Sequence, residues 1–352
     1  MLKSFRYLLF PFSIVYGGAI WIRNKLFDKK ILRAAKFNFP LICVGNLALG
    51  GTGKTPMVEY LVSMLKDRYK VATLSRGYKR KTKGFAIAND GATAVQIGDE
   101  PMQIHIKFPD VTVAVAEERV IGIPQLLYEK PATQLIVLDD AFQHREVEAG
   151  MNILLTDYNN LYTRDILLPA GDLRDIKSSS KRADIIIVTK CKASLDENEK
   201  NKIISELKPL PHQSVFFTRI QYSSLRHLFS NRTCHLEPDH ELLLVCGIAN
   251  PAPLKEAVAS QVSSYELLTF RDHHIFNSDD LKEIKRSFAK IKNEKKIILT
   301  TEKDGVRLAK YEKELKEMPV YVFPIEHRFL FGQEAKFENE VLQYIESFEK
   351  MR

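Results

Sequence analysis

The feature that most restricts the fold of this chain is a glycine-rich stretch between an apolar run and an amphipathic run. Residues 40–45 are typical of a buried strand, and residues 56–67 have the apolar spacing of a helix. Such a strand, loop and helix bind phosphate through backbone N–H groups and the helix N-terminus. We therefore predict an ATP-binding loop in which Lys54 contacts the β- and γ-phosphates and Thr55 binds Mg²⁺. The loop consists of Gly50, Gly51, Thr52, Gly53, Lys54 and Thr55.

Apolar and amphipathic runs alternate along the rest of the chain. Continuous apolar runs between helical segments indicate strands of a parallel sheet that is covered on both faces. Further strands are expected at residues 71–74, 111–116, 135–138, 152–157, 184–189, 214–220, 242–247, 265–270, 296–301 and 320–324. A polar stretch rich in lysine and glutamate, residues 193–210, separates two such blocks. The predicted fold class is α/β, with two α/β domains that meet near residues 210–220.

Residues 7–22 form an uncharged stretch between basic residues. The first 38 residues contain eight lysines or arginines and one aspartate, so they supply +7 of the net charge of +8. The stretch is slightly short for a spanning helix, but its aromatic residues and flanking cations suit a lipid surface. We interpret it as a membrane anchor that spans or lies on the bilayer; a buried helix of a soluble domain is the alternative. Nucleic acid is not an expected partner, because the basic residues flank an apolar stretch rather than cover a folded face.

Two adjacent acids, Asp139 and Asp140, end the strand expected at residues 135–138. In proteins with a phosphate loop, a carboxylate at this position lies beside the loop and holds Mg²⁺ directly or through water. The pair therefore predicts a magnesium site, and the sequence does not indicate which of the two acids contacts the ion. A solvated turn is the alternative interpretation.

Several motifs occur together, in order, along nearly the whole chain. They are Val44-Gly45-Asn46 before the phosphate loop, Ser75-Arg76-Gly77-Tyr78, Gly98-Asp99-Glu100-Pro101, Asp139-Asp140-Ala141-Phe142-Gln143-His144, Leu167-Leu168-Pro169-Ala170-Gly171 with Leu173-Arg174, Asp272-His273, and Thr301-Glu302-Lys303-Asp304. This set resembles the tetraacyldisaccharide 4′-kinases of lipid A biosynthesis. The resemblance includes a missing first glycine in the phosphate loop, where this chain has Ala48. The chain departs from the family pattern at Ala141, Phe142 and Asp172, which affects local backbone shape rather than the chemistry.

The resemblance implies transfer of the γ-phosphate of ATP to the 4′-hydroxyl of a tetraacylated glucosamine disaccharide 1-phosphate. It also implies work at the cytoplasmic face of the bacterial inner membrane. The implied fold has two α/β/α domains, the first like a P-loop NTPase, that are joined by a two-stranded hinge. We divide the chain into an N-terminal anchor helix (residues 1–36), a kinase domain (37–212), a smaller domain (213–325) and a C-terminal helix (326–352) whose return to the first domain is left open. We expect a monomer.

The resemblance also assigns roles to single residues. Asp99 matches the catalytic aspartate and His273 its partner, so that this pair would accept the hydroxyl proton. Glu100 would assist Mg²⁺ or the base. Candidate contacts to phosphate or to the acceptor sugar are Arg76, Arg119, Gln143 and His144. Lys303 and Asp304 match the family, but the sequence assigns them no role.

Two other functions fit part of the sequence. A membrane-recruited nucleotide switch would use the phosphate loop and the acid pair, but it has no need of Asp99 with His273. A basic membrane scaffold could bind nucleotide for stability alone. The four cysteines are far apart and lack metal-binding spacing, so we expect reduced thiols, two of them in buried strands.

Overall fold

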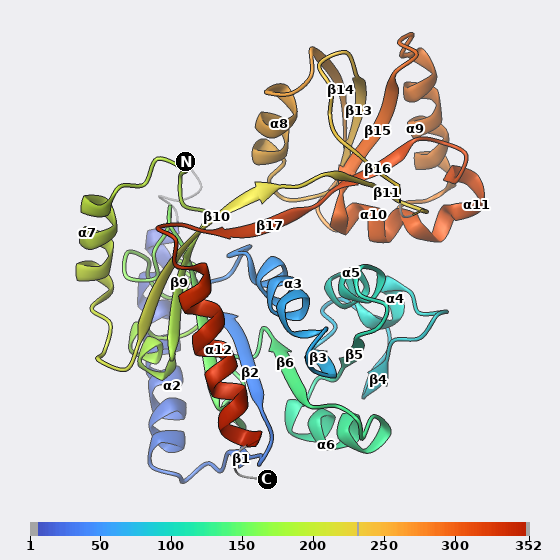
Figure 1. The fold of residues 1–352 in the computed structure, drawn as a ribbon. Helices are drawn as coiled ribbons and strands as arrows, with labels where there is room; N and C mark the ends of the chain where they lie inside the picture. The colour runs from blue at the N-terminus through green and yellow to red at the C-terminus, as the bar shows by residue number, and fades with distance from the viewer. Residues whose placement is uncertain (1–5, 231, 350–352) are drawn as a thin grey trace.

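The chain folds around two large β-sheets, as the computed structural model of residues 6–230 and 232–349 shows (Figure 1). The larger sheet has nine strands in the order β17-β10-β9-β8-β2-β6-β3-β5-β4. Its strands are β2 (Leu41–Asn46), β3 (Val71–Ser75), β4 (Ala86–Ile87), β5 (Thr112–Val115), β6 (Leu135–Asp139), β8 (Met151–Asp157), β9 (Ile185–Thr189), β10 (Ser214–Tyr222) and β17 (Ile325–Phe329). The strands from β10 to β5 are parallel, and only the two edge pairings, β17 with β10 and β4 with β5, are antiparallel.

Alternate residues of the parallel strands face two hydrophobic layers, as expected for a sheet that is buried on both sides. Ile42 and Val44 of β2 pack with the helices α3 (Lys54–Leu65), α5 (Asp99–Lys107) and α12 (Glu334–Glu349). Leu41 and Cys43 pack with α6 (Arg119–Glu129) and α7 (Glu197–Leu207). The helices of the first half are α3 (Lys54–Leu65), α4 (Ala94–Ile97), α5 (Asp99–Lys107), α6 (Arg119–Glu129) and α7 (Glu197–Leu207), with a 3-10 turn η2 (Lys177–Arg182). The short strands β1 (Ala35–Lys36) and β7 (Val147–Glu148) form a separate parallel pair.

The smaller sheet has six strands in the order β12-β11-β16-β15-β13-β14. Its strands are β11 (Leu225–His227), β12 (Thr233–Cys234), β13 (Glu241–Cys246), β14 (Ser264–Thr269), β15 (Lys296–Thr301) and β16 (Val320–Phe323). Helix α8 (Ala252–Ala259) covers one face, and α9 (Ser278–Lys290), α10 (Glu302–Leu308) and α11 (Glu312–Leu315) contribute to the core on the other. A 3-10 turn, η3 (Ala309–Tyr311), lies between α10 and α11. The α/β class is therefore confirmed, with a parallel core in both sheets.

The chain crosses between the two sheets twice, at neighbouring positions. Strand β10 leads directly into β11, and β16 leads directly into β17. Both β10 and β17 belong to the nine-stranded sheet, so the chain leaves this sheet after Tyr222 and returns to it at Ile325. After β17, helix α12 (Glu334–Glu349) packs in the core of the larger sheet through Phe337, Val341 and Ile345.

Helix α2 (Phe10–Asp28), preceded by a 3-10 turn η1 (Tyr7–Leu9), lies along the larger unit (Figure 1). One side is held by polar contacts: Ser13 Oγ donates to the Leu167 carbonyl at 2.9 Å, and Asn24 Nδ2 donates to Asp175 Oδ1 at 3.0 Å. The other side leaves large apolar side chains in solvent; Phe12 is 64% exposed and Val15 is 73% exposed. None of the helices in the described part of the chain is long and apolar enough to cross a bilayer.

Candidate active site

The phosphate loop has the backbone that its glycines predict. Gly50 and Gly53 have φ angles of 102° and 87°, which side chains with a Cβ rarely adopt. A Cβ on Gly53 would also lie 3.1 Å from the ring of His327, whereas Gly50 and Gly51 have no atom within 4 Å of such a Cβ. The loop therefore packs against His327 at Gly53, whereas at Gly50 and Gly51 a phosphate can approach its backbone.

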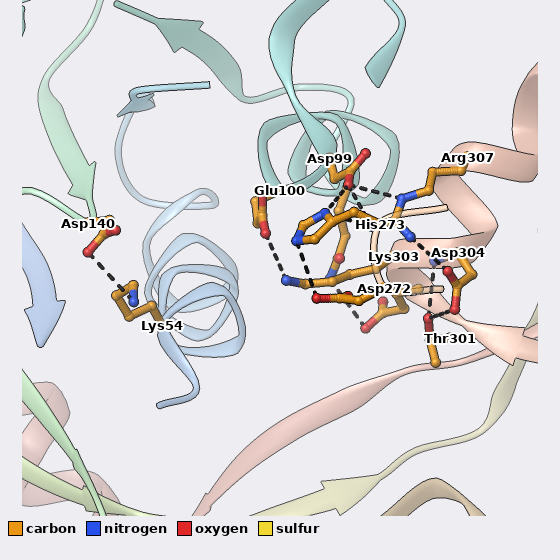
Figure 2. Close-up of polar contacts among 12 residues, drawn as sticks. Lys54, Asp99, Glu100, Asp140, Asp272, His273, Thr301, Lys303, Asp304 and Arg307 are labelled. Carbon is orange, nitrogen blue, oxygen red and sulfur yellow. Dashed lines mark hydrogen bonds and ion pairs between the residues drawn. The ribbon is translucent and has the colours of Figure 1, made fainter. Parts of the chain in front are cut away.

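Lys54 opens helix α3 and points toward the acid pair after β6. Its Nζ lies 3.2 Å from Asn46 Oδ1. It also lies 3.6 Å from Asp140 Oδ1, as Figure 2 shows. Asn46 also donates through Nδ2 to Thr52 Oγ1 at 2.9 Å, which ties the end of β2 to the loop. Burial lowers the pKa of Lys54, and Asp140 partly opposes this shift. Thr55 is buried in the first turn of α3, beside Lys54.

The two acids at the end of β6 have opposite environments. Asp140 accepts hydrogen bonds from Arg174, and although burial opposes its ionisation, Lys54 and Arg174 hold its pKa at about 2. Asp139 is buried, and its Oδ1 has no hydrogen-bond partner among the described residues. Burial, reinforced by the charges of Asp140 and Glu100, raises the pKa of Asp139 to about 6. Lys54 and Arg119 oppose this rise only in part, so Asp139 is the less well compensated of the two carboxylates.

Asp99 and His273 belong to segments that adjoin different sheets, and they meet in the structure. Asp99 is the first residue of α5, and His273 follows β14 with a φ of 58°. His273 Nδ1 lies 3.2 Å from Asp99 Oδ2 (Figure 2). His274 instead lies 2.8 Å from Asp280, which supports His273 as the residue of the histidine pair that faces Asp99.

Helix α10 contributes three charged residues beside this pair. Lys303 Nζ lies 2.7 Å from Glu100 Oε1, and Arg307 Nη2 lies 2.6 Å from Asp99 Oδ2. Asp304 accepts from the backbone N–H of Gly247 at 2.9 Å and from Arg307 Nη1 at 2.9 Å. The lysine and aspartate that lacked a role in the sequence therefore connect α10 to α5 and to the end of β13.

The other predicted contact residues lie around the acid pair but differ in accessibility. Gln143 donates through Nε2 to the Asn46 carbonyl at 2.7 Å, and burial lowers the pKa of the partly exposed His144 to about 4. Arg76 is exposed, and its loop reaches α5 because Gly77, with a φ of 69°, packs against Gly98.

Arg119 is not on the surface: it is 1% exposed and donates to the carbonyls of Ala116 at 2.6 Å and of Asp139 at 3.1 Å. In this conformation its guanidinium supports the end of β6 instead of facing solvent. Arg80, in the basic segment after Arg76, also forms an ion pair within the protein, with its Nη2 2.6 Å from Glu117 Oε1.

Comparison with known proteins assigns the chain to a family. A family model described as tetraacyldisaccharide-1-P 4′-kinase matches residues 5–346. The tetraacyldisaccharide 4′-kinase of Bacteroides thetaiotaomicron is 44% identical and aligns with 96% of this chain and 92% of its own length. The enzyme of the same name from Flavobacterium johnsoniae is 46% identical over 97% of both chains. The chain belongs to the tetraacyldisaccharide-1-P 4′-kinase family.

A solved structure from this family has the same fold. It is described as the "apo" form of LpxK from Aquifex aeolicus in complex with ATP, and it matches with a TM-score of 0.77 and 29% identity over 98% of this chain and 100% of its own. The comparisons confirm the family resemblance drawn from the motifs. The chain is an enzyme, a kinase of lipid A biosynthesis, as the sequence analysis predicted.

Around the predicted site, sequence reasoning missed two arginines. Arg174, noted only as part of a motif, binds both Asp140 and Asn46 Oδ1, the latter at 2.5 Å. Arg307 was not singled out, although it lies three residues after Asp304 in a segment that begins a helix. That spacing places Asp304 and Arg307 on one helix face, and it could have indicated that Arg307 pairs with Asp304.

Proposed function

We propose that this chain transfers the γ-phosphate of ATP to the 4′-hydroxyl of a tetraacylated glucosamine disaccharide 1-phosphate, giving the 4′-phosphorylated lipid A precursor. The observation that carries the proposal is the contact of Asp99 with His273, 3.2 Å apart although 174 residues separate them. A nucleotide switch has no use for such a pair, whereas a kinase needs a proton acceptor beside the hydroxyl that attacks phosphorus.

In the proposed reaction, the open backbone of residues 50–53 holds the β- and γ-phosphates, and Lys54 neutralises part of their charge. Asp99 accepts the proton of the acceptor hydroxyl, and His273 orients Asp99. Arg76, Gln143 and His144 are proposed contacts of the acceptor sugar or its phosphate. For Arg119 we propose support of the strand end that carries Asp139, because its guanidinium is buried there.

The residues near the loop fit a magnesium ion. Mg²⁺ usually takes one or two carboxylates together with substrate phosphates and water, so a dedicated protein cage is not required. The described residues contain no group of three or more His, Cys, Asp or Glu side chains that could hold a metal alone. Asp139, with a buried and unpaired Oδ1, is our choice of carboxylate ligand, with Thr55 as the hydroxyl ligand. The ion would neutralise charge on the phosphates.

Asp140 and Glu100 are less available as ligands, since each is already paired with a cation: Asp140 with Arg174 and Lys54, and Glu100 with Lys303. We propose that Asp140 fixes Lys54 and Arg174 beside the loop. Glu100 remains a candidate ligand because its charge raises the pKa of Asp139, which indicates that the two carboxylates share one region.

We also propose that the enzyme works on the cytoplasmic face of the bacterial inner membrane, with α2 as its anchor. The helix exposes Phe12, Val15 and Trp21 while its polar side is held by the protein. The basic residues around it suit anionic headgroups. A helix that presents apolar side chains to the surface can lie at the interface with those side chains in the lipid.

The proposed domains are an anchor helix, a kinase domain built on the nine-stranded sheet and a smaller domain built on the six-stranded sheet. β10 and β17, which pair antiparallel where the chain crosses between sheets, are the proposed two-stranded hinge. We propose that the protein acts as a monomer, because Asp99 and His273 meet within one chain.

The test is a transfer assay with ATP labelled on the γ-phosphate, purified protein in detergent, and a tetraacyl disaccharide 1-phosphate. Label is expected in the lipid only with acceptor and Mg²⁺, and Asp99→Ala is expected to abolish most of it while leaving ATP binding intact. Hydrolysis of ATP without label in the lipid would refute the proposal and favour a nucleotide switch.

A further inference from the structure

Arg307 occupies the position between the two residues that the proposed function pairs. Its side chain is buried, with 6% of its surface exposed, at the first turn of α5. Its Nε and Nη2 lie 3.0 Å and 2.6 Å from Asp99 Oδ2, and its Nη2 lies 3.1 Å from His273 Nδ1. A guanidinium presents its five N–H donors in a rigid planar fork, whereas an ammonium has three rotatable donors on a single atom.

The contacts to Asp99 are asymmetric between its two oxygens. Arg307 Nε, Arg307 Nη2 and His273 Nδ1 all approach Oδ2, and no hydrogen bond among the described residues reaches Oδ1. Asp99 is not sealed from solvent, since 17% of its side-chain surface is exposed. The carboxylate is therefore held by one oxygen, and its second oxygen is free to take a hydrogen bond from a ligand.

Arg307 is itself held in place from the other side. Its Nη1 donates to Asp304 Oδ1 at 2.9 Å and to the Gly247 carbonyl at 3.2 Å. Asp304 in turn accepts from Thr301 Oγ1 at 2.8 Å, at the residue that caps α10. The guanidinium thus connects a fixed helix end in the smaller unit to the carboxylate at the start of α5.

We propose that Arg307 is a positioning residue for phosphoryl transfer: it holds Oδ2 of Asp99 and the ring of His273 so that Oδ1 is the atom that receives the acceptor proton. This deepens the proposed function and rests on it. In the step, the 4′-oxygen forms a bond to the γ-phosphorus, the bond from that phosphorus to the β–γ bridging oxygen breaks, and ADP leaves with the electron pair. The proton of the 4′-hydroxyl passes to Asp99 Oδ1.

The position of His273 is compatible with either tautomer. Its Nδ1 lies within hydrogen-bond distance of an acceptor, Asp99 Oδ2, and of a donor, Arg307 Nη2. The ring therefore keeps a partner whether Nδ1 carries a proton or not. Arg307 can accordingly hold the pair together before and after the proton reaches Asp99.

The experiment compares Arg307→Ala, Arg307→Lys and wild type in the transfer assay, with kcat and KM measured separately for ATP and for the lipid acceptor. Misplacement of a reacting group by about 1 Å costs on the order of 100-fold in rate, so Arg307→Ala should lose about that factor in kcat with KM for ATP little changed. Guanidinium ion added to Arg307→Ala should restore part of the rate. The same addition should not restore Asp99→Ala.

Arg164→Ala is the control, because Arg164 pairs with Glu206 on the surface of the larger unit, 50% exposed, and has no part in the site. If Arg307→Ala does not fold, Arg307→Lys provides the measurement, since it keeps the charge beside Asp304 but not the fork of donors. The kcat of Arg307→Lys should be lower than that of wild type and, where Arg307→Ala folds, higher than that of Arg307→Ala. A wild-type kcat in folded Arg307→Ala would overturn the inference. A loss of kcat that guanidinium does not reverse, accompanied by a rise of KM for ATP by the same factor, would also overturn it. A wild type that transfers no phosphate to lipid would instead refute the proposed function.

Discussion

A buried polar cluster links the phosphate-loop helix to both halves of the site, and it carries an excess negative charge. Lys107 Nζ lies 2.7 Å from Glu59 Oε2 and 3.1 Å from Glu302 Oε1, and Gln103 Nε2 donates to Glu59 Oε1 at 2.7 Å. Glu59 is 4% exposed and Glu302 is 5% exposed. One lysine thus faces two carboxylates away from water. Burial, reinforced by Glu302, raises the pKa of Glu59 from 4.5 to about 7.

The raised pKa of Glu59 makes the stability of the fold depend on pH in a defined window. A carboxyl whose pKa rises on folding is penalised in its ionised form, so the penalty is absent below the unfolded pKa near 4.5 and complete above about 7. The full penalty is on the order of 3 kcal/mol, because a tenfold change in an ionisation constant corresponds to about 1.4 kcal/mol. About 2 kcal/mol of this penalty develops between pH 5.5 and pH 8.

Glu59→Gln removes that charge and keeps the side-chain shape. We expect it to raise the free energy of unfolding at pH 8 relative to wild type, and the advantage should be about 2 kcal/mol smaller at pH 5.5. The Oε1 atom of Gln103 is buried without a partner, so a turned Gln103 amide can accept from the new amide group. Urea unfolding followed by far-ultraviolet circular dichroism at several pH values measures the difference.

The matched control is Glu197→Gln, which removes a carboxylate that is 63% exposed on α7 and should leave the pH profile unchanged. The reasoning fails if wild type and Glu59→Gln lose stability in parallel between pH 5.5 and pH 8. It also fails if the variant is less stable by the same amount at every pH, because that result would mean that the difference does not depend on the ionisation of Glu59.

Three further outcomes follow from the site and from α2. Asp139→Asn should lower kcat by at least about 100-fold at saturating ATP, measured by phosphate transfer across a range of Mg²⁺ concentrations, and a wild-type response to Mg²⁺ would exclude Asp139 as a ligand. Gly53→Ala adds a Cβ 3.1 Å from the ring of His327 at a φ of 87°. The resulting strain of about 1–2 kcal/mol should lower the ATP affinity, measured by calorimetry, by about tenfold. The control Gly332→Ala, with a φ of 63° and open space around the added Cβ, should bind ATP normally. Val15→Glu should reduce sedimentation with anionic vesicles and leave thermal stability within about 0.5 kcal/mol, since Val15 is 73% exposed; equal sedimentation would argue against α2 as the anchor.

The parallel core of both sheets could be predicted because buried strands have a continuous apolar signal. Residues 40–45 and 184–189 were expected as strands, and the structure has β2 at Leu41–Asn46 and β9 at Ile185–Thr189. The edge strands β4 and β17 were not predicted. β17 reads Ile-Glu-His-Arg-Phe, with polar residues that face solvent or the loop, so hydropathy provides no strand signal there.

The part of the proposed site that contains Asp99 and His273 was harder to predict from the residues themselves. Gly98-Asp99-Glu100-Pro101 reads alone as a turn, but the structure begins α5 at Asp99, with both acids in its first turn, where the helix dipole favours negative charge. The contact of Asp99 with His273 depends on how the two sheets are placed relative to each other. No local pattern encodes that placement, and only the family resemblance suggested the pair.

Helix α5 is the element that connects the parts of the proposed reaction. Its first turn pairs Asp99 with Arg307 and Glu100 with Lys303, both on α10, and its last turn places Lys107 between Glu59 of α3 and Glu302 of α10. Since α3 begins at the phosphate loop, these pairs together set the distance from Lys54 to Asp99. Substitutions at the buried cluster should therefore change kcat without contact to either substrate, because a small shift of α5 moves Asp99 relative to the γ-phosphate.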